Sequence, residues 1–476
     1  MSAPPPTRSA AALLAVLLTG TFMTSLDVTI VNVAVPSIQH DLGGSGAVLQ
    51  LVVNGYSVAL AALLVLGARL GDDRGHRRLF LAGLAGFTAA SAACGVAAGP
   101  GMLVAARVLQ GISAAALVPQ VLTIIQLRFE GAARTRALGL QASVIALGAV
   151  VGQLVGGALI DADLAGAGWR PVFLVNVPVG LAVLAAGMVV LPRTHGARRR
   201  LDVAGAVLLT GGVVLAMVPL CFGRQAGWAW WTWACLAAAA ALAVALVGHL
   251  RRHPEPLADL RLMGRRPVGL GLGSIALQMV AYGGFLFTLT LHLQGQLGFS
   301  PLRAGLTFGP YALGFAVTSL GCAGLRPAVA RRVGPAALAL AAAGYVVLGL
   351  AAAGGSWRDE LALPLLAVTG AGFGAGWSAV IGRMMGEVPA AHAQDASGLL
   401  TTTVQLCFAV GVATIGSVFL GDAADGSAGA FAVAAVACGA LALDAALVAA
   451  LQWRRPRGAA AGDAAVAAAS SLRAGA

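Results

Sequence analysis

The sequence is poor in charge. Only 10% of its 476 residues are Asp, Glu, Lys or Arg, whereas 59% are hydrophobic and the mean hydropathy is +0.88. An ordinary soluble domain is about 25% charged. A chain of this length with so little charge would not stay dissolved, so its apolar surface must face lipid. The composition excludes a string of soluble domains, a disordered protein and a fibrous protein.

Lysine is absent, yet the net charge is +12 because the chain contains 30 arginines. A basic chain can bind nucleic acid or a membrane surface, and the position of the charges decides between them. Bilayer-crossing segments need about 20 apolar residues and must be helical, because lipid cannot satisfy a free backbone. The sequence predicts fourteen such helices, near 9–35, 47–68, 79–98, 101–126, 137–160, 172–191, 202–222, 229–250, 268–293, 304–325, 335–354, 361–382, 396–420 and 429–451.

The arginines separate by side of the membrane. With the N-terminus placed in the cytoplasm, 25 of them fall in inner segments and only Arg170, Arg224, Arg303 and Arg358 fall in outer loops. Short loops on the cytoplasmic side carry such an excess of positive charge. We therefore predict a multi-pass protein of the plasma membrane with both termini in the cytoplasm. No nucleic-acid partner is expected, because the arginines are spread over every inner loop.

The predicted loops leave no room for a soluble catalytic domain. The six cysteines all lie in or at predicted spans, with spacings that fit neither a metal site nor an outer disulfide. Residues 454–476 are predicted to form a disordered cytoplasmic tail. A transporter without metal or cofactor is therefore expected. A membrane enzyme would need an acidic or His cluster at an interface, and a receptor or channel would leave the charges described next unexplained.

Two opposite charges lie at similar depth in predicted spans. Asp27 is roughly 13 Å before Pro36, and Arg107 is roughly 10 Å after Pro100, at 1.5 Å per helical residue. Each alone would be costly in lipid, so we predict that they pair. A carboxylate that can exchange an Arg partner for a proton suits proton-driven transport, and a purely structural ion pair is the alternative. Asp444 is expected at the lipid edge and His292 as an interfacial hydrogen-bonder, with a coupling role left open for both.

Several uncharged polar residues lie at membrane depth. Each one alone is explained by helix packing. Together they predict a mostly apolar cavity with a few polar contacts, which suits lipophilic or amphipathic substrates. The candidates are Asn32, Asn54, Tyr56, Gln110, Gln120, Gln153, Gln278 and Gln405, with Gln141 at similar depth.

Two motifs concern helix ends and helix packing. The first inner loop places Asp72 among arginines, before Gly75 and Arg77, so the acid can lock one conformation and Gly75 can adopt a positive φ. In the fifth predicted helix a small-residue stripe permits close approach of another backbone. It consists of Gly148, Gly152, Gly156 and Gly157.

In this order, these motifs resemble the major facilitator superfamily. The fourteen spans and residues 26–36, 169–180 and 396–400 with Gln405 resemble its fourteen-helix drug:proton antiporter branch. The resemblance implies six-helix bundles at 1–191 and 267–453, a two-helix insert with an inner linker at 192–266, and alternating access. It also implies a monomer that exports drugs, antibiotics or cationic dyes, with the proton gradient as energy source.

The resemblance also implies roles for matching residues. Asp27 and Arg107 would couple protons, Asp72, Gly75 and Arg77 would form a gating loop, and the glycine stripe would be the antiporter motif. Asp73, His76 and Gln153 depart from the usual pattern, which predicts a weaker or rewired gating pair and a less kinked fifth helix. The alternative function is proton-coupled transport of one specific metabolite or natural product on the same fold.

Overall fold

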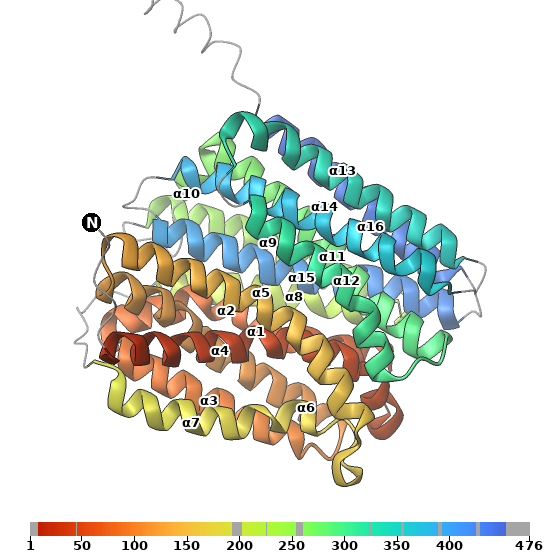
Figure 1. Cartoon of the computed structure of the whole chain (residues 1–476), viewed down its shortest axis with the longest axis horizontal. Coiled ribbons are helices and arrows are strands. Elements are labelled where there is room, and N and C mark those ends of the chain that lie inside the picture. The colour runs from red at the N-terminus through yellow and green to blue at the C-terminus, as the bar shows by residue number, and fades with distance from the viewer. Residues whose placement is uncertain are drawn as a thin grey trace, which may run out of the picture.

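The computed structural model describes residues 8–43, 45–192, 202–224, 226–253, 260–322, 325–353, 357–388, 393–424 and 429–453. Within these ranges every regular element is helical (Figure 1). The first part of the chain contains α1 (Arg8–Leu42), α2 (Gly46–Arg74), α3 (His76–Gly95), α4 (Pro100–Arg128), α5 (Gly131–Asp161), η1 (Leu164–Gly166), α6 (Pro171–Leu174) and α7 (Asn176–Val190). Two long helices and a short one follow, α8 (Val203–Phe222), α9 (Trp230–Arg252) and α10 (Leu260–Gly264).

The second part of the chain repeats the pattern of long helices and short connections. It contains α11 (Arg266–Leu291), the π-helical turn η2 (His292–Gln296), α12 (Pro301–Cys322), α13 (Pro327–Ala352), α14 (Asp359–Gly386), α15 (Ala393–Ala424) and α16 (Ala430–Gln452). The predicted tail, 454–476, lies outside the described residues.

In the described part of the chain, twelve helices are long and apolar enough to cross a membrane. The prediction of fourteen is not confirmed by this measure, because the helices predicted near 137–160 and 304–325, which are α5 and α12, are not among the twelve. Of α5, the stretch Val151–Asp161 counts as a shorter apolar helix. In α12, Arg303, Pro310 and several glycines lower the apolar character. The chain is thus an all-helical, multi-span membrane protein.

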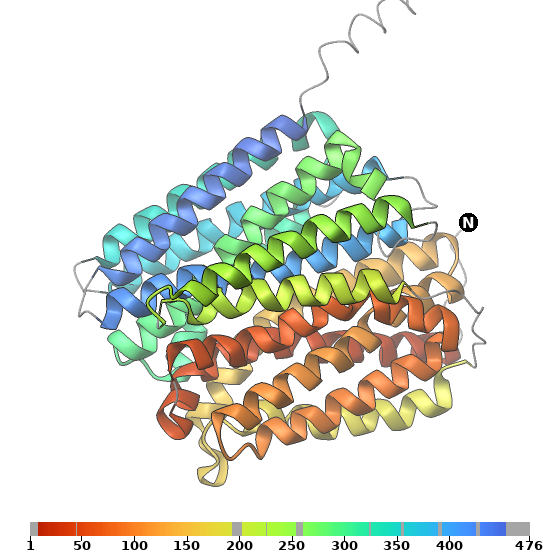
Figure 2. The same cartoon turned by 180° about the vertical axis from the view of Figure 1, so that it is seen from behind.

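Chain position sorts the helices into two groups that lie side by side, α1–α7 below and α11–α16 above in Figure 1. The second view shows α8 and α9 on the outside, across the junction of the two groups (Figure 2). Helix α8 packs against α2 and α15, whereas α9 packs mainly on α8. Only 6% of the most apolar stretch of α9 is buried, as expected for a helix that faces lipid on most sides.

Each end of the molecule has its own chemistry. Helix direction alternates along the chain, so Arg77, Arg128 and Arg331 lie at one end, here named the arginine-rich end. Asp41 and Trp169 lie at the other, here named the opposite end. Gly75 joins α2 to α3 at the arginine-rich end with a φ of 96°, so the predicted positive φ is confirmed.

Candidate functional site

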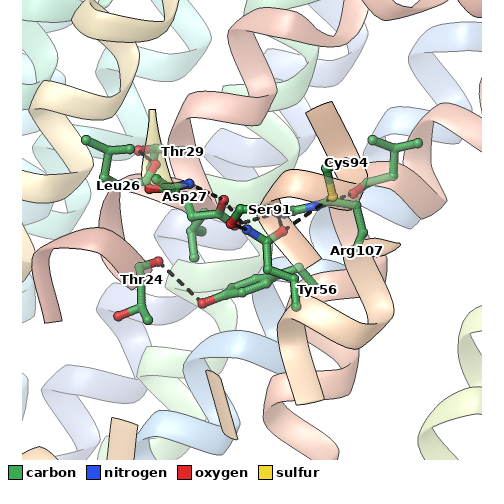
Figure 3. Close-up of polar contacts among 12 residues, drawn as sticks. Thr24, Leu26, Asp27, Thr29, Tyr56, Ser91, Cys94 and Arg107 are labelled. Carbon is green, nitrogen blue, oxygen red and sulfur yellow. Dashed lines mark hydrogen bonds and ion pairs between the residues drawn. The ribbon is translucent and has the colours of Figure 1, made fainter. Parts of the chain in front are cut away.

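Asp27 on α1 and Arg107 on α4 form an ion pair inside the first group of helices (Figure 3). Both side chains are 0% exposed. Arg107 Nη1 donates to Asp27 Oδ2 and also to Gln110 Oε1 at 2.7 Å, while Arg107 Nε donates to the Val52 carbonyl at 3.0 Å. The guanidinium is therefore held by groups on α1, α2 and its own helix.

The second carboxylate oxygen of Asp27 has its own donors. Gln110 Nε2 donates to Asp27 Oδ1 at 2.7 Å and Asn176 Nδ2 donates to it at 3.3 Å. Gln110 also donates to Ser91 Oγ at 2.8 Å. A buried ion pair is tolerated only when its remaining hydrogen-bonding capacity is satisfied. Here amides from α4 and α7 bond the carboxylate and a hydroxyl from α3 bonds Gln110, whereas Arg107 Nη2 is buried without a hydrogen-bond partner. Four helices besides α2 therefore meet at this charge.

Tyr56 separates the ion pair from the space between the two groups of helices. The Arg107 guanidinium lies 4.8 Å from the Tyr56 ring centroid, within cation–π range, and 5.7 Å from that of Phe173. The Tyr56 hydroxyl donates to the Thr24 carbonyl at 3.4 Å (Figure 3). Tyr56 and Thr24 line the cavity described next, whereas Asp27 and Arg107 do not.

A cavity of about 1070 Å³ lies between the two groups of helices. Its wall toward the first group is formed by α1, α2, α4 and α5, and its wall toward the second group by α11, α12, α14 and α15. It reaches Leu325, Arg383 and Trp453, which lie at the arginine-rich end. A volume of this size is at the upper end of the usual range for small-molecule sites.

The opposite end is closed by contacts between the two groups. Gln50 Nε2 on α2 donates to Ser417 Oγ on α15 at 3.1 Å. Gln294 donates from η2 to the Val33 carbonyl of α1 at 3.0 Å. An added Cβ at Gly157 would lie 2.6 Å from the Pro301 carbonyl oxygen, so α5 and α12 touch there as well. The cavity therefore faces the arginine-rich end.

The glycine stripe of α5 packs against α1 at the height of Asp27. An added Cβ would lie 2.9 Å from the Ser25 Cβ at Gly148, 2.8 Å from the Leu26 carbonyl oxygen at Gly152 and 2.9 Å from Ile30 Cγ1 at Gly156. Real Cβ atoms essentially never approach other atoms this closely. The stripe thus permits backbone contact with the segment of α1 that carries the buried acid, and Gly157 permits contact with α12.

At the arginine-rich end, His76 contacts both the loop acid and α4. His76 Nε2 is 3.7 Å from Asp72 Oδ1, and His76 Nδ1 is 2.8 Å from Gln120 Oε1 on α4. Gln120 Nε2 in turn donates to the Gly67 carbonyl at 2.9 Å, while Arg77 donates to the Met188 carbonyl at 2.5 Å. His76, at a position that departs from the family pattern, thereby connects the loop acid to α4.

Of the eight predicted cavity residues, the structure places Tyr56 and Gln405 at the cavity, and Gln141 also lines it. Gln110 belongs to the ion pair and Gln120 to the loop network. Three of the remaining four amides bond backbone or a neighbouring side chain, as buried amides in lipid often do. Asn32 donates to the Val28 carbonyl at 3.0 Å, Gln153 to the Thr29 carbonyl at 3.2 Å, Gln278 to Ser274 Oγ at 3.2 Å, and Asn54 is buried between helices.

The two other ionisable residues lie away from the Asp27 cluster. Asp444 is exposed on α16 beside exposed Leu443 and Leu447, which places it on the lipid side. His292 is 2% exposed, with Nδ1 2.6 Å from Gln296 Oε1 and its ring stacked on Phe431 at 4.6 Å.

Sequence reasoning missed four residues that the fold brings to the site or to the closed end. Ser91 and Asn176 complete the ion-pair network, and Gln50 and Ser417 join the two groups of helices. Asn176 stands in a segment, 169–180, that resembles a family motif, so a signal for it was present. The other three lie in ordinary apolar helices and carry no distinguishing pattern.

Comparisons with known proteins agree with this architecture. The chain matches the Major Facilitator Superfamily over residues 17–412. It is 40% identical to a probable actinorhodin transporter of Streptomyces coelicolor over 88% of this chain and 74% of the relative. It is 36% identical to the cephamycin export protein of Amycolatopsis lactamdurans over 86% of this chain and 85% of the relative.

Solved structures share the fold at low identity. The POT family transporter PepTSo superposes with a TM-score of 0.67 at 17% identity, over 94% of this chain and 98% of that chain. The human organic anion transporter MFSD10 superposes with a TM-score of 0.62 at 19% identity, over 94% of this chain and all of that chain. The chain therefore belongs to the major facilitator superfamily, and it is a membrane transporter rather than an enzyme. Its relatives include antibiotic export and resistance proteins.

Proposed function

We propose that this protein exports small lipophilic or amphipathic compounds, antibiotics among them, in exchange for protons. The observation that carries the proposal is the buried Asp27–Arg107–Gln110 cluster next to a large, mostly apolar cavity. The relatives named for export of cephamycin and tetracenomycin C support the export direction, and together with the probable actinorhodin transporter they support the kind of cargo.

The proton step follows from the bonds of Asp27. As a carboxylate it accepts bonds from Arg107, Gln110 and Asn176 and has no proton to give. A proton on either oxygen removes the charge that holds Arg107, so the guanidinium must turn to other partners. Val52, Gln110 and the Tyr56 ring already contact it. Proton binding thereby loosens the junction of α1, α2 and α4 without leaving Arg107 bare.

Helix α1 connects the proton step to the cargo. Thr24, one turn before Asp27, and Val28, the residue directly after it, line the cavity, and Tyr56 contacts both the ion pair and Thr24. A movement of α1 or of Tyr56 therefore changes the proton site and the cavity together. Such shared elements let two ligands bias one conformational equilibrium.

The conformation and the orientation form part of the same proposal. Because the cavity faces the arginine-rich end and the arginines divide 25 to 4 between the sides, that end is cytoplasmic, with both termini there, and the structure is the inward-facing state. Opening to the outside requires the Gln50–Ser417 and Gln294–Val33 contacts to part. His76 contacts Asp72 and Gln120 at the arginine-rich end. The loop that carries Asp72 and His76 is therefore placed to lock the outward-facing state, in which this end is closed.

We further propose the fourteen-helix drug:proton antiporter branch, with α5 and α12 as spans and bundles at 1–191 and 267–453 around the insert 192–266. The support is that α5 runs along α1 and α12, and α12 along α14, over the length of the bundle (Figure 1). The cavity is enclosed by one chain, which supports a monomer.

Purified protein in lipid vesicles with an imposed pH gradient tests the proposal. Relatives of this chain are named for export of tetracenomycin C and for resistance to puromycin. These two antibiotics should drive a proton flux that a pH dye reports, and Asp27→Asn should remove that flux. Asp444→Asn, on the lipid side, is the matched control and should keep it. Absence of any compound-driven proton flux in the wild type would refute proton-coupled export. Flux with one compound alone would favour the alternative, a transporter of one natural product.

A further inference from the structure

The two walls of the cavity differ in chemistry. The wall from the second group of helices carries eight aromatic side chains, whereas the wall from the first carries Tyr56 alone. One of the eight, Trp453, lies at the arginine-rich end. The other seven contact one another, and they are Tyr282, Phe308, Tyr311, Phe315, Phe373, Trp377 and Phe408. Such one-sided placement is informative because random apolar lining would distribute rings over both walls.

Several of these rings lie nearly parallel. The centroids of Tyr282 and Tyr311 are 6.1 Å apart with planes 15° apart, those of Phe308 and Tyr311 are 5.0 Å apart at 28°, and those of Phe373 and Trp377 are 6.5 Å apart at 13°. Offset parallel rings stabilise flat aromatic groups laid against them. This wall, here named the aromatic wall, suits a planar ring system.

The facing wall offers hydroxyl groups whose protons are already committed. Thr21 donates to the Leu17 carbonyl, Thr24 to the Thr21 carbonyl, Ser25 to the Ile145 carbonyl and Thr29 to the Leu26 carbonyl. The Tyr56 hydroxyl donates to the Thr24 carbonyl. A hydroxyl has one proton and two lone pairs, so each of these oxygens can only accept further bonds. Gln141 is also on this wall, and its amide can donate as well as accept. The five hydroxyls outnumber it, so this wall, here named the acceptor wall, favours a ligand that donates hydrogen bonds.

The described lining contains no carboxylate to receive a cation. Among its residues the charged side chain is Arg383, at the arginine-rich end, where Nη1 donates to Glu387 Oε1. The carboxylate of Asp27 is behind Tyr56 and holds three donors. Ring faces attract cations. Without a counter-charge, however, the hydration free energy that a cation loses on leaving water exceeds what the attraction of a ring face supplies.

We propose that the cavity binds flat, fused-ring aromatic compounds that carry hydroxyl donors and no positive charge. The ring system lies on the aromatic wall and its hydroxyls donate to Thr24, Ser25 and their neighbours on the acceptor wall. This substrate class rests on the proposed export function and narrows it, since cationic dyes, which the sequence resemblance includes, become the poorer ligands.

Three probes of similar size separate the contributions of ring stacking, hydroxyl donors and positive charge to binding. They are 2,6-dihydroxyanthraquinone, anthraquinone without hydroxyls, and the N-methylacridinium cation. Equilibrium dialysis against the purified protein in lipid nanodiscs, without a pH gradient, measures the affinities at a pH that keeps the phenols protonated. The dihydroxy compound should bind roughly fivefold or more tighter than anthraquinone, given the usual gain per hydrogen bond. The cation should bind most weakly. A cation that binds as tightly as the dihydroxy compound, or no binding by any probe, would overturn the proposal.

Variants assign the preferences to the two walls. Thr24→Val and Ser25→Ala should lower the affinity for the dihydroxy compound alone, whereas Phe373→Leu should weaken all three probes several-fold. Matched controls away from the cavity are Thr123→Val, whose hydroxyl also bonds a backbone carbonyl at 3.2 Å, and Phe299→Leu. Unchanged preference in Thr24→Val and Ser25→Ala would contradict the acceptor wall.

The wild-type comparison of the three probes stands even where a variant fails to fold. The binding measurement needs no transport. A failure of the proposed substrate class can therefore be distinguished from a failure of the proposed export function. Compound-driven proton flux in vesicles with no preference among the probes would leave the proposed export in place and refute the substrate class.

Discussion

The two groups of helices share a fold and differ in what they bury. The first group, α1–α7, contains the buried ion pair and its amides. The second group, α11–α16, buries a Tyr311–Tyr345 hydroxyl pair at 2.8 Å and a cluster of rings, and no ion pair among its described residues is fully buried. We propose that the two groups have separate tasks. We interpret the first group as the coupling half and the second as the ligand-holding half, and the following predictions test that division.

The largest effect is expected at the ion pair. Arg107→Gln or Asp27→Asn leaves one charge buried without its partner, which costs about 3–5 kcal/mol and should remove proton-driven transport. The double variant removes both charges and should regain much of the stability, but not the transport. Thermal unfolding in detergent and vesicle flux measure these outcomes. Additive losses of stability in the double variant would mean that the two side chains do not act as a pair.

The next effect is expected at the aromatic wall. Tyr282→Leu removes a ring that contacts Tyr311, Phe373 and Phe408, and an aromatic pair contributes about 0.5–1.5 kcal/mol beyond area burial. Affinity for an exported compound should fall up to tenfold, while proton coupling per molecule moved stays intact. Asp27→Asn should show the reverse pattern. If Tyr282→Leu abolishes coupling and leaves binding unchanged, the division of tasks is wrong.

The third effect, on stability and transport rate rather than on ligand affinity, is expected where the coupling half is packed most tightly. Gly152→Ala places a Cβ 2.8 Å from the Leu26 carbonyl oxygen, and overpacking of this kind costs about 1–3 kcal/mol. The transport rate should fall because α1 and α5 can no longer keep their contact. Gly248→Ala on α9 meets no atom within 4 Å and is the control. Equal losses in both variants would point to general helix effects rather than to this contact.

The smallest effect is expected at the contact that joins the two halves. Gln50→Leu removes the hydrogen bond that Gln50 Nε2 donates to Ser417 Oγ, and such a bond contributes about 0.5–1.5 kcal/mol. The equilibrium should shift toward a state open at the opposite end. Distances between spin labels at exposed His40 and Glu360, in a background without the six native cysteines, report this shift. The control variant Thr123→Val should leave the distances unchanged. Unchanged distances in Gln50→Leu would show that the Gln50–Ser417 contact does not hold the opposite end closed.

Some of this site could be predicted from residues alone. Asp27 and Arg107 stand out because a charge in a long apolar run is costly, and equal depth suggested the pair that the structure contains. The glycine spacing likewise predicted close backbone approach. The eight polar candidates for the cavity were less informative, because an amide that bonds a neighbouring backbone and an amide that faces a cavity look the same in the sequence.

The sequence by itself determined the helical, membrane-spanning class and the superfamily pattern. Hydropathy, arginine positions and local motifs are properties of one helix or one loop. The helical class and the superfamily pattern can therefore be predicted without knowledge of tertiary contacts. Only the tertiary structure decided that Ser91 and Asn176 complete the ion-pair network, that Tyr56 stands between it and the cavity, and that the rings gather on one wall. Those features depend on which faces of distant helices meet, and helix-to-helix packing is set by side-chain fit over the whole bundle.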